Sequence, residues 1–235
     1  MQCEFNDRGE LLILDGQGDL FKYSKEGVRL QNYTSDAGMN PDKVQVISVF
    51  KNMLFYQAQQ KSILLDQYLS ASIQVDLTKY DVRFIDDLVM DTQQNLWFLD
   101  GSNFTLNQLN TVTSEVLLTK FLDRDSLYSP DGKIELLSYR NQIYLVIADQ
   151  SIVVLDNLGN QVKVIPVKGL NSFGMTRDQY YYALKGQIVL EHLYSEKREE
   201  IPLPSQNFDH IYFHDDILIG VRGQGFEIYQ YLRQN

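Results

Sequence analysis

The sequence predicts an all-β protein, a six-bladed β-propeller of four-stranded antiparallel blades. The main observation is a phrase that recurs along the 235 residues: a short apolar stretch, a polar turn, a hydrophobic strand ending in Asp or Gly, another turn, and two more strands. Self-similarity at a fixed period built from short strands is typical of a propeller, in which each repeat is one blade. No long stretch carries the apolar i, i+3, i+4 stripe of a helix.

The first three repeats each supply four strands, named a to d in chain order. The spacing predicts these strands at Glu4–Asn6, Glu10–Asp15, Asp19–Tyr23 and Val28–Tyr33; Val44–Phe50, Asn52–Ala58, Ser62–Tyr68 and Ala71–Leu77; Asp87–Thr92, Asn95–Gly101, Phe104–Thr113 and Glu115–Leu122. Strand b of the third repeat contains the apolar run Leu96–Leu99, which indicates burial between neighbouring blades. Strand d of the second repeat alternates apolar and polar residues over Ser72–Leu77, which indicates a half-exposed outer strand.

The last three repeats follow the same pattern with one exception. Their strands are expected at Ile134–Arg140, Asn141–Asp149, Ser151–Leu158 and Gln161–Lys168; Ser172–Met175, Gln179–Leu184, Gln187–Leu193 and Glu199–Pro202; Asp209–Phe213, Ile217–Arg222 and Phe226–Leu232. The sixth repeat therefore has three strands, and Phe226–Leu232 is expected to be an open sheet edge. The alternative is that one strand of this repeat is misplaced. We expect residues 1–235 to form a single propeller domain.

The segment Asp91–Asp100 resembles the core motif D-x-x-G-N-L-W-x-x-D of NHL-type and sensor-type propellers with six or seven blades. Its turn glycine is replaced by Gln94. Ser129–Gly132 and Asp156–Asn160 are similar as turn phrases. The resemblance covers most of the chain as a fold and is specific at Asp91–Asp100. It implies a propeller scaffold, which hosts many unrelated activities.

Composition restricts the class of partner. The formal net charge is −10 and the pI is about 4.7, with Lys and Arg scattered rather than gathered into a stripe, so a nucleic-acid partner is not expected. The acidity serves either solubility or an acidic face that meets a basic partner. The sequence contains no run of about 18 apolar residues, the length that a membrane-spanning helix needs.

Cys3 is the only cysteine, which excludes an intrachain disulfide and a multi-cysteine zinc site. Two interpretations stay open: a thiol packed in the first strand, or the lipidated cysteine of a bacterial lipoprotein whose signal peptide was removed. The second predicts a periplasmic or outer-membrane-associated protein attached through a lipid at Cys3. A cytoplasmic protein is the other alternative.

Three clusters of residues are candidates for chemical sites, and one glycine-rich segment resembles a phosphate loop. The first-strand residues Asp87, Asp91, Glu135, Asn171 and Asp209 could hold calcium in an enzyme that resembles the gluconolactonase group, but no matched Glu/Asn/Asn/Asp set recurs. Asp123–Arg124–Asp125 with Asp131–Gly132 could hold calcium or form an ordinary turn. In a strand, His210 and His214 lie too far apart to chelate one ion, which favours a hairpin turn at His214–Asp216. The glycine-rich Gly220–Gly225 joins two strands and is expected to be a turn.

The preferred functional interpretation is a non-enzymatic propeller that binds another protein, as a subunit or accessory factor of a larger assembly, with a bacterial cell envelope as one expected location. The b–c turns and d–a loops would form the binding face. Its predicted residues are Asp100, Asn103, Phe104, Lys185, Arg222, Gln224 and Phe226, with the loops Asp36–Asp42 and Asp123–Asp131. A partner strand beside Phe226–Leu232 is a second expected mode. No cofactor is expected. A calcium-dependent lactonase or phosphotriesterase-like hydrolase and a ligand-sensing module are the alternatives.

Overall fold

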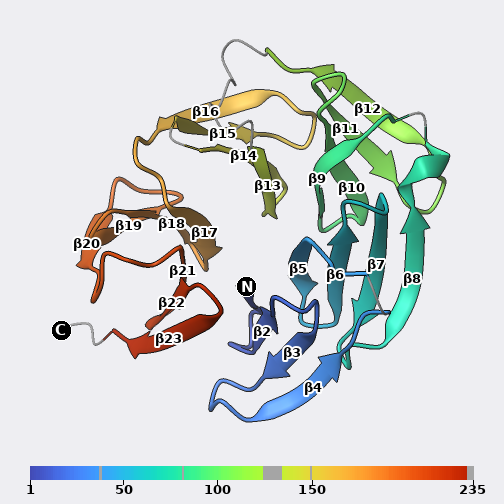
Figure 1. Ribbon diagram of the computed structural model, residues 1–235. Coiled ribbons are helices and arrows are strands. Elements are labelled where there is room, and N and C mark those ends of the chain that lie inside the picture. Colours follow the sequence, from blue (N-terminus) through green and yellow to red (C-terminus); the bar gives the residue numbers. More distant parts are fainter. Residues whose placement is uncertain (37–38, 81, 124–133, 149, 232–235) are drawn as a thin grey trace. The chain divides into compact units, whose positions relative to one another are not determined.

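The computed structural model describes residues 1–36, 39–80, 82–123, 134–148 and 150–231. Two compact units divide the chain: a large unit of residues 2–147 and 152–165, and a small unit of Met1, 148–151 and 166–235. Across the described residues there are six antiparallel sheets, five with four strands and one with three. These are the six predicted blades (Figure 1). The single-domain organisation of residues 1–235 stays a prediction.

The large unit holds the first four blades, and in each blade the strands pair in chain order. Its strands are β1 (Gln2–Phe5), β2 (Leu11–Leu14), β3 (Leu20–Tyr23) and β4 (Arg29–Tyr33); β5 (Lys43–Ser48), β6 (Lys51–Tyr56), β7 (Lys61–Asp66) and β8 (Ala71–Asp76); β9 (Ile85–Met90), β10 (Asn95–Asp100), β11 (Thr105–Asn110) and β12 (Val116–Phe121); β13 (Ile134–Tyr139), β14 (Gln142–Ile147), β15 (Ser151–Leu155) and β16 (Gln161–Pro166). A 3-10 turn, η1 (Leu77–Lys79), follows β8.

The small unit holds the last two blades. Its strands are β17 (Ser172–Thr176), β18 (Gln179–Leu184), β19 (Gln187–His192) and β20 (Arg198–Pro202), then β21 (His210–His214), β22 (Ile217–Arg222) and β23 (Gly225–Gln230). Every predicted strand is present, with ends shifted by a few residues. The described part of the chain contains no helix of the length and apolarity that a membrane crossing requires.

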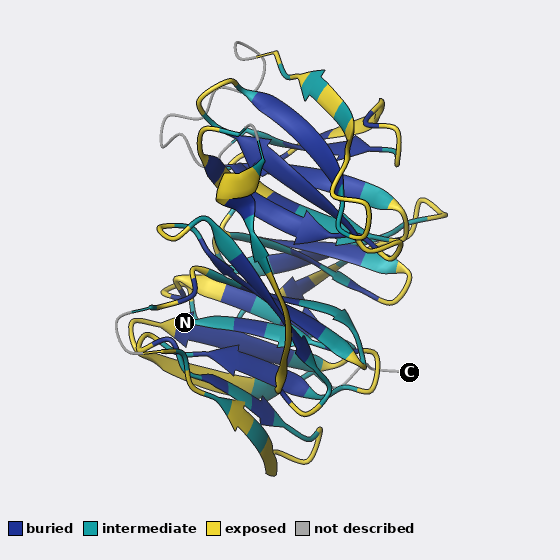
Figure 2. Cartoon of the chain, turned by 90° about the vertical axis from the view of Figure 1, so that its right-hand side faces the viewer, coloured by how far each residue is buried: buried dark blue, intermediate teal, exposed yellow. Residues whose placement is uncertain are grey.

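Burial falls from the middle strands of each blade to its last strand (Figure 2). All six residues of β10 are buried, as the run Leu96–Leu99 predicts. The last strand β8 is mostly exposed, and its apolar face is less covered than the alternation at Ser72–Leu77 predicts: Ile73 is 54% exposed, whereas Leu77 is buried. A last strand has a neighbour strand on one side only, so solvent reaches it from the other side.

Apolar side chains pack between consecutive blades within each unit. In the large unit, Leu12 and Leu54 belong to one such cluster and Phe55 and Phe98 to the next. In the small unit, Tyr181 of β18 and Phe213 of β21 pack edge to face, with ring centroids 6.1 Å apart. Each blade therefore gains its stability by burying an apolar face against the next blade.

The same pattern of side-chain-to-backbone hydrogen bonds recurs in several turns, and it explains the polar residues that follow the strands. A short polar side chain at the end of a strand accepts the backbone N–H groups two and four residues later, as Asp15 does from Gln17 and Asp19 at 2.8 and 3.0 Å. The same pair of bonds occurs at five further turns, which begin at Asn6, Ser24, Asp66, Asp91 and Asp156. Asp, Asn and Ser side chains are short and can accept hydrogen bonds from nearby backbone N–H groups. These residue types therefore occur at the turns of each repeat.

The motif Asp91–Asp100 is an elaborated form of this turn. The buried Asp91 carboxylate also accepts the indole N–H of Trp97 at 3.0 Å and lies 3.4 Å from the Gln108 amide nitrogen. At the glycine position of the motif, Gln94 adopts φ 66°, the left-handed conformation that glycine usually supplies. The Gln94 side chain accepts from Lys51 at 2.6 Å, which ties this turn to the preceding blade.

Candidate binding face

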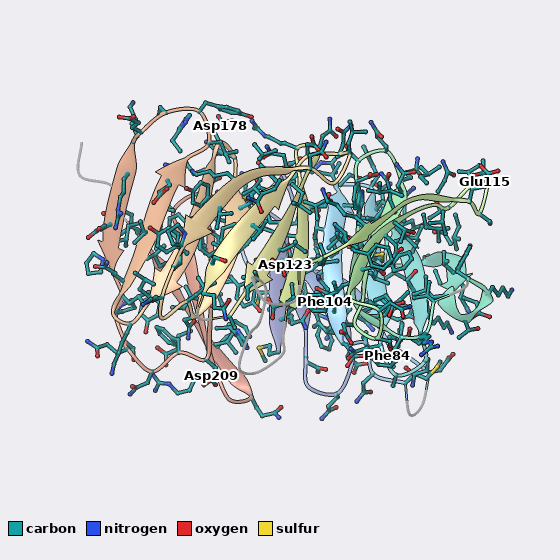
Figure 3. All side chains as sticks on the ribbon, turned by 90° about the horizontal axis from the view of Figure 1, so that it is seen from above. Phe84, Phe104, Glu115, Asp123, Asp178 and Asp209 are labelled. Carbon is teal, nitrogen blue, oxygen red and sulfur yellow. The ribbon has the colours of Figure 1, made fainter. Side chains whose placement is uncertain are left out.

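Each blade has two ends, and the predicted binding face lies at the end that carries the b–c turns and d–a loops. In the small unit, Asp178 lies in the turn between β17 and β18, and Asp209 lies just before β21. Figure 3 shows these two residues at opposite ends of their strands. In the large unit, Phe84 and Phe104 likewise lie toward one end and Glu115 toward the other.

In the large unit, the predicted residues Asp100, Asn103 and Phe104 share the turn between β10 and β11. Asp100 is buried, and its Oδ1 accepts the backbone N–H groups of Ser102 and Asn103 at 2.9 and 3.1 Å. The Asn103 side-chain amide donates to Asp100 Oδ2 at 2.8 Å. Phe104, with φ 55°, packs against the core between the third and fourth blades. Asp100 thus builds the turn, and Asn103 is exposed on it.

In the small unit, Lys185 is exposed on the two-residue turn Lys185–Gly186 between β18 and β19. Gly186 has φ 89°, a conformation that glycine adopts at no steric cost. Two flanking d–a loops fix this turn, because Asn171 N donates to Ala183 O and Leu203 N donates to Gly186 O, each at 2.9 Å. The lysine therefore stands on a well-anchored turn with its ammonium in solvent.

Arg222, Gln224 and Phe226 surround the turn between β22 and β23, and all three are exposed. Arg222 donates from Nε to Asn207 O at 3.1 Å and from Nη2 to Ser205 Oγ at 2.9 Å. Its guanidinium also lies 5.5 Å from the centroid of the Phe208 ring. These contacts join the d–a loop before β21 to the turn after β22, so both belong to one face of the small unit.

The same end of the small unit contains a cavity of about 310 Å³ that sequence analysis missed. Three segments far apart in the sequence line it: Gly169–Asn171, Leu184–Gly186 and the loop from Leu203 to Phe208, with Ile211 of β21. No local pattern marks such a site, because its walls meet only after the blades pack. Lys185 is the one residue of the predicted binding face among them, and Asn171 of the candidate calcium set also lines the cavity.

The edge strand β23 pairs with β22 and with no other strand in the part of the chain that the structure describes. The predicted open edge is thus confirmed for Phe226 to Gln230; the strand ends before Tyr231, and Leu232 lies outside the described residues. Tyr231 N donates to Asp216 O at 2.7 Å. Because bonding alternates along an antiparallel pair, the N–H and C=O groups of Phe226, Ile228 and Gln230 face away from β22.

The first strands of neighbouring blades are joined by polar side chains rather than by backbone pairing. Gln45 of β5 both accepts from Met90 N and donates to Met90 O, at 2.8 and 2.9 Å. Gln2 accepts from Val44 N at 3.1 Å, and in the small unit Ser172 accepts from Ile211 N at 2.8 Å. These bonds satisfy backbone groups that belong to separate sheets.

In the large unit, Asp87 makes a charged link between first strands. Its Oδ2 accepts both Lys43 Nζ and Leu136 N at 2.7 Å, and Lys43 Nζ also donates to Leu136 O at 2.7 Å. Burial raises the pKa of the Asp87 carboxyl, partly offset by the Lys43 ammonium and the Leu136 N–H. This candidate calcium ligand is therefore engaged in a structural ion pair with Lys43.

The other acids weighed for calcium also have protein partners. Asp91 holds its own turn, and Asp209 Oδ2 accepts Gly223 N at 2.7 Å. Among the described residues, no three His, Cys, Asp or Glu side chains gather in a way that could hold a metal ion. His214 ends β21 and a turn follows at Asp215–Asp216, as expected. Of the acidic loop, residues 124–133 lie outside the described part of the chain, as do residues 37–38 of the loop Asp36–Asp42.

Cys3 lies in β1, where it pairs with Ile13, and its side chain is fully buried. Burial, with a smaller contribution from Glu4, raises the pKa of the thiol to about 12. This location fits the interpretation of Cys3 as a thiol packed in the first strand. Lipidation at Cys3 stays a prediction.

Glu4 of β1 gives stability a pH dependence. Burial raises the pKa of its carboxyl from 4.5 to about 7, although Lys43 lowers it in part. The folded state then binds more protons than the unfolded state between about pH 4.5 and pH 7, so stability falls as the pH rises through that window. Above pH 7 the ionised Glu4 opposes folding by roughly 3 kcal/mol.

We therefore expect Glu4→Gln to raise the melting temperature at pH 8 and to flatten the dependence of stability on pH between about 4.5 and 7. Thermal unfolding of both proteins across pH 4 to 9, roughly the range around the folded and unfolded pKa values, measures this effect. Equal pH profiles for the two proteins would contradict the assignment to Glu4.

No protein-family model and no curated protein sequence matches this chain. Among solved structures, a streptogramin B lyase superposes with a TM-score of 0.63 at 12% identity over 96% of this chain and 77% of that chain. Virginiamycin B lyase from Staphylococcus aureus gives a TM-score of 0.57 at 11% identity over 99% of this chain and 84% of its own.

A third similar structure is the extracellular domain of BT4673 from B. thetaiotaomicron, described as a hybrid two-component system, with a TM-score of 0.59 and 13% identity. This chain is matched over 97% of its length but spans only 33% of that chain. The fold is a β-propeller. At such low identity the likeness extends to the fold alone, because lyases and a sensor domain share it.

Proposed function

We propose that this β-propeller is a non-enzymatic protein-binding subunit or accessory factor of a larger assembly. The partner would add a strand to the open edge of β23 and would contact the b–c turns and d–a loops beside it. The observation that carries this proposal is the unpaired edge of β23 together with the side chains on it: Phe226 is 40% exposed and Ile228 is 58% exposed.

An edge of this kind favours strand addition for two reasons. The outward N–H and C=O groups of Phe226, Ile228 and Gln230 offer the hydrogen bonds that an extended segment needs. Phe226 and Ile228 point to one side of the sheet and offer apolar area to alternate side chains of that segment. Exposed apolar edge strands pair readily with other chains unless charge, proline or a covering element prevents it.

The charge of the protein favours a partner of a different kind over a second copy. Two copies would each bring a formal net charge of −10, whereas a partner with a basic surface would be attracted and steered to the edge. Glu227, exposed on β23, would lie opposite a basic residue of the added strand. Cross-strand pairs of opposite charge stabilise a sheet modestly.

The turns around β23 would supply specificity. Arg222 and Gln224 lie at the turn that precedes the edge, and Lys185 lies on the neighbouring blade of the same unit. In the large unit, a second b–c turn carries the exposed Asn103. The buried Asp100 stabilises this turn through hydrogen bonds, and Phe104 packs against the core beside it. Attachment to a cell envelope through a lipid at Cys3 stays a separate prediction, because the Cys3 side chain is buried in β1.

Purification from the native source under mild conditions, with the native N-terminus kept, tests this function. Mass spectrometry of the preparation is expected to identify at least one other protein in a stoichiometric amount. The mass of the intact chain shows in the same experiment whether Cys3 carries a lipid. A pure monomer that carries calcium and hydrolyses a lactone or phosphotriester would overturn the proposal in favour of the hydrolase.

A further inference from the structure

The cavity of the small unit has the form of a ligand site. Its volume of about 310 Å³ lies within the range of small-molecule pockets. It opens between the turn Lys185–Gly186 and the two d–a loops that flank that turn. It contains no residue of β23, so an inference from this cavity is independent of strand addition.

The floor of the cavity is apolar. The side chains that form it come from both blades of the small unit: Leu170, Leu184, Leu203, Phe208 and Ile211. Phe208 and Ile211 are buried members of the core between β18 and β21. Because Phe208 and Ile211 are held in the core, this part of the floor is pre-organised to receive an apolar group.

The rim of the cavity is positively charged. The Lys185 ammonium makes no hydrogen bond or ion pair with any described residue, and none of the eleven lining residues is acidic. A second positive charge, on Arg222, lies behind Ser205. In a protein of net charge −10, this is a local reversal of sign. The acid nearest along the chain, Asp209, accepts the Gly223 N–H.

Two neutral lining residues, Ser205 and Gln206, can donate hydrogen bonds to a ligand. Ser205 Oγ accepts from Arg222 Nη2 at 2.9 Å and from Asn207 N at 3.3 Å, which leaves its own proton to donate. The Gln206 amide nitrogen lies 3.5 Å from the position that a Cβ on Gly186 would take, so it covers the turn beside Lys185. Lysine, serine and glutamine together offer N–H and O–H groups to an acceptor.

We propose that this cavity binds a small organic anion, a carboxylate on an apolar stem. The stem would cover the floor and the carboxylate would accept from Lys185 and from Ser205 or Gln206. One free lysine balances the single charge of a carboxylate better than the near-double charge of a phosphate monoester. The carboxylate can belong to a free organic acid or to the C-terminus of a peptide.

Titration of the isotope-labelled protein, followed by amide NMR signals, tests this proposal. The probes are hexanoate with hexanamide as its neutral control, and an acetylated tripeptide ending in leucine with its C-terminal amide as control. We expect saturable shifts of the Gly186, Gln206 and Ile211 signals with at least one carboxylate and none with either amide. Preference for hexanoate indicates a free acid, and preference for the peptide indicates a C-terminus.

The matched variants are Lys185→Gln and Lys197→Gln. Both lysines are exposed, and Lys197 lies in the turn after β19, at the other end of the blade. We expect Lys185→Gln to weaken binding about tenfold or more, as for loss of a hydrogen bond to a charged group, and Lys197→Gln to leave it unchanged. Absence of saturable shifts, equal binding of acids and amides, or equal affinity of the two variants would overturn the proposal.

Discussion

Replacing Asp87 with alanine is expected to lower the free energy of unfolding of the large unit by about 3 to 5 kcal/mol. The Asp87 carboxylate joins Lys43 and the Leu136 N–H, each at 2.7 Å, and the two side chains of the ion pair are only 20% and 11% exposed. Alanine would leave a partly buried ammonium without its counter-ion and a buried backbone N–H without an acceptor.

Chemical unfolding followed by fluorescence of Trp97, the only tryptophan, measures this loss. Trp97 is buried in β10, beside β9, so its emission reports on the blade that carries Asp87. Asp86→Ala is the matched control, because Asp86 lies one residue away but is exposed. Burial and repulsion by Asp100 and Asp87 raise the pKa of the Asp86 carboxyl, so its loss should cost about 0.5 kcal/mol or less.

A double variant separates the ion pair from the loss of packing. Removal of both charges in Lys43→Met with Asp87→Leu should recover part of the stability that Asp87→Ala loses, because the Lys43 ammonium is then no longer left partly buried without its counter-ion. If Asp87→Ala unfolded at the same denaturant concentration as Asp86→Ala, the polar link between the first strands would not contribute to stability.

The blades were predictable because their signals are local. Period-two patterning and short polar turn residues repeat within each blade, and the Asp15 and Asp156 turns show the bonds that this pattern encodes. The three-stranded sixth blade was predicted in the same way, because the sixth repeat contains only three segments with the strand pattern. The exposure of Ile73 was not predicted, because the pattern of a strand does not reveal whether its outer face meets another element.

The links between blades were not predictable, because their partners are remote in sequence. Lys43 and Asp87 are 44 residues apart, and each could pair with many other charges. Gln94 was recognised as a departure from the motif, but its contact with Lys51 depends on the packing of two blades. Among the site residues, nothing in the sequence distinguishes Asp100, which is buried in its own turn, from Asn103, which is exposed.

Ile228→Pro is expected to weaken binding of the co-purified partner about 10- to 100-fold relative to Ile228→Ala, which corresponds to loss of one or two hydrogen bonds with the desolvation of their partners. Both substitutions remove the exposed apolar side chain of Ile228, but only proline removes the outward N–H and places a ring at the edge. The ladder between β22 and β23 makes no use of that N–H, since Tyr231 and the residues in phase with it pair with β22. Proline at an edge position is therefore compatible with the fold.

The affinity of the partner for these two variants is the measurement that tests strand addition most directly. Equal melting temperatures of the variants establish first that the sixth blade is intact in both. The account predicts that Ile228→Ala retains most of the binding and that Ile228→Pro loses it. Equal affinities for the two variants would show that the partner forms no backbone hydrogen bonds with β23, and would contradict the proposal.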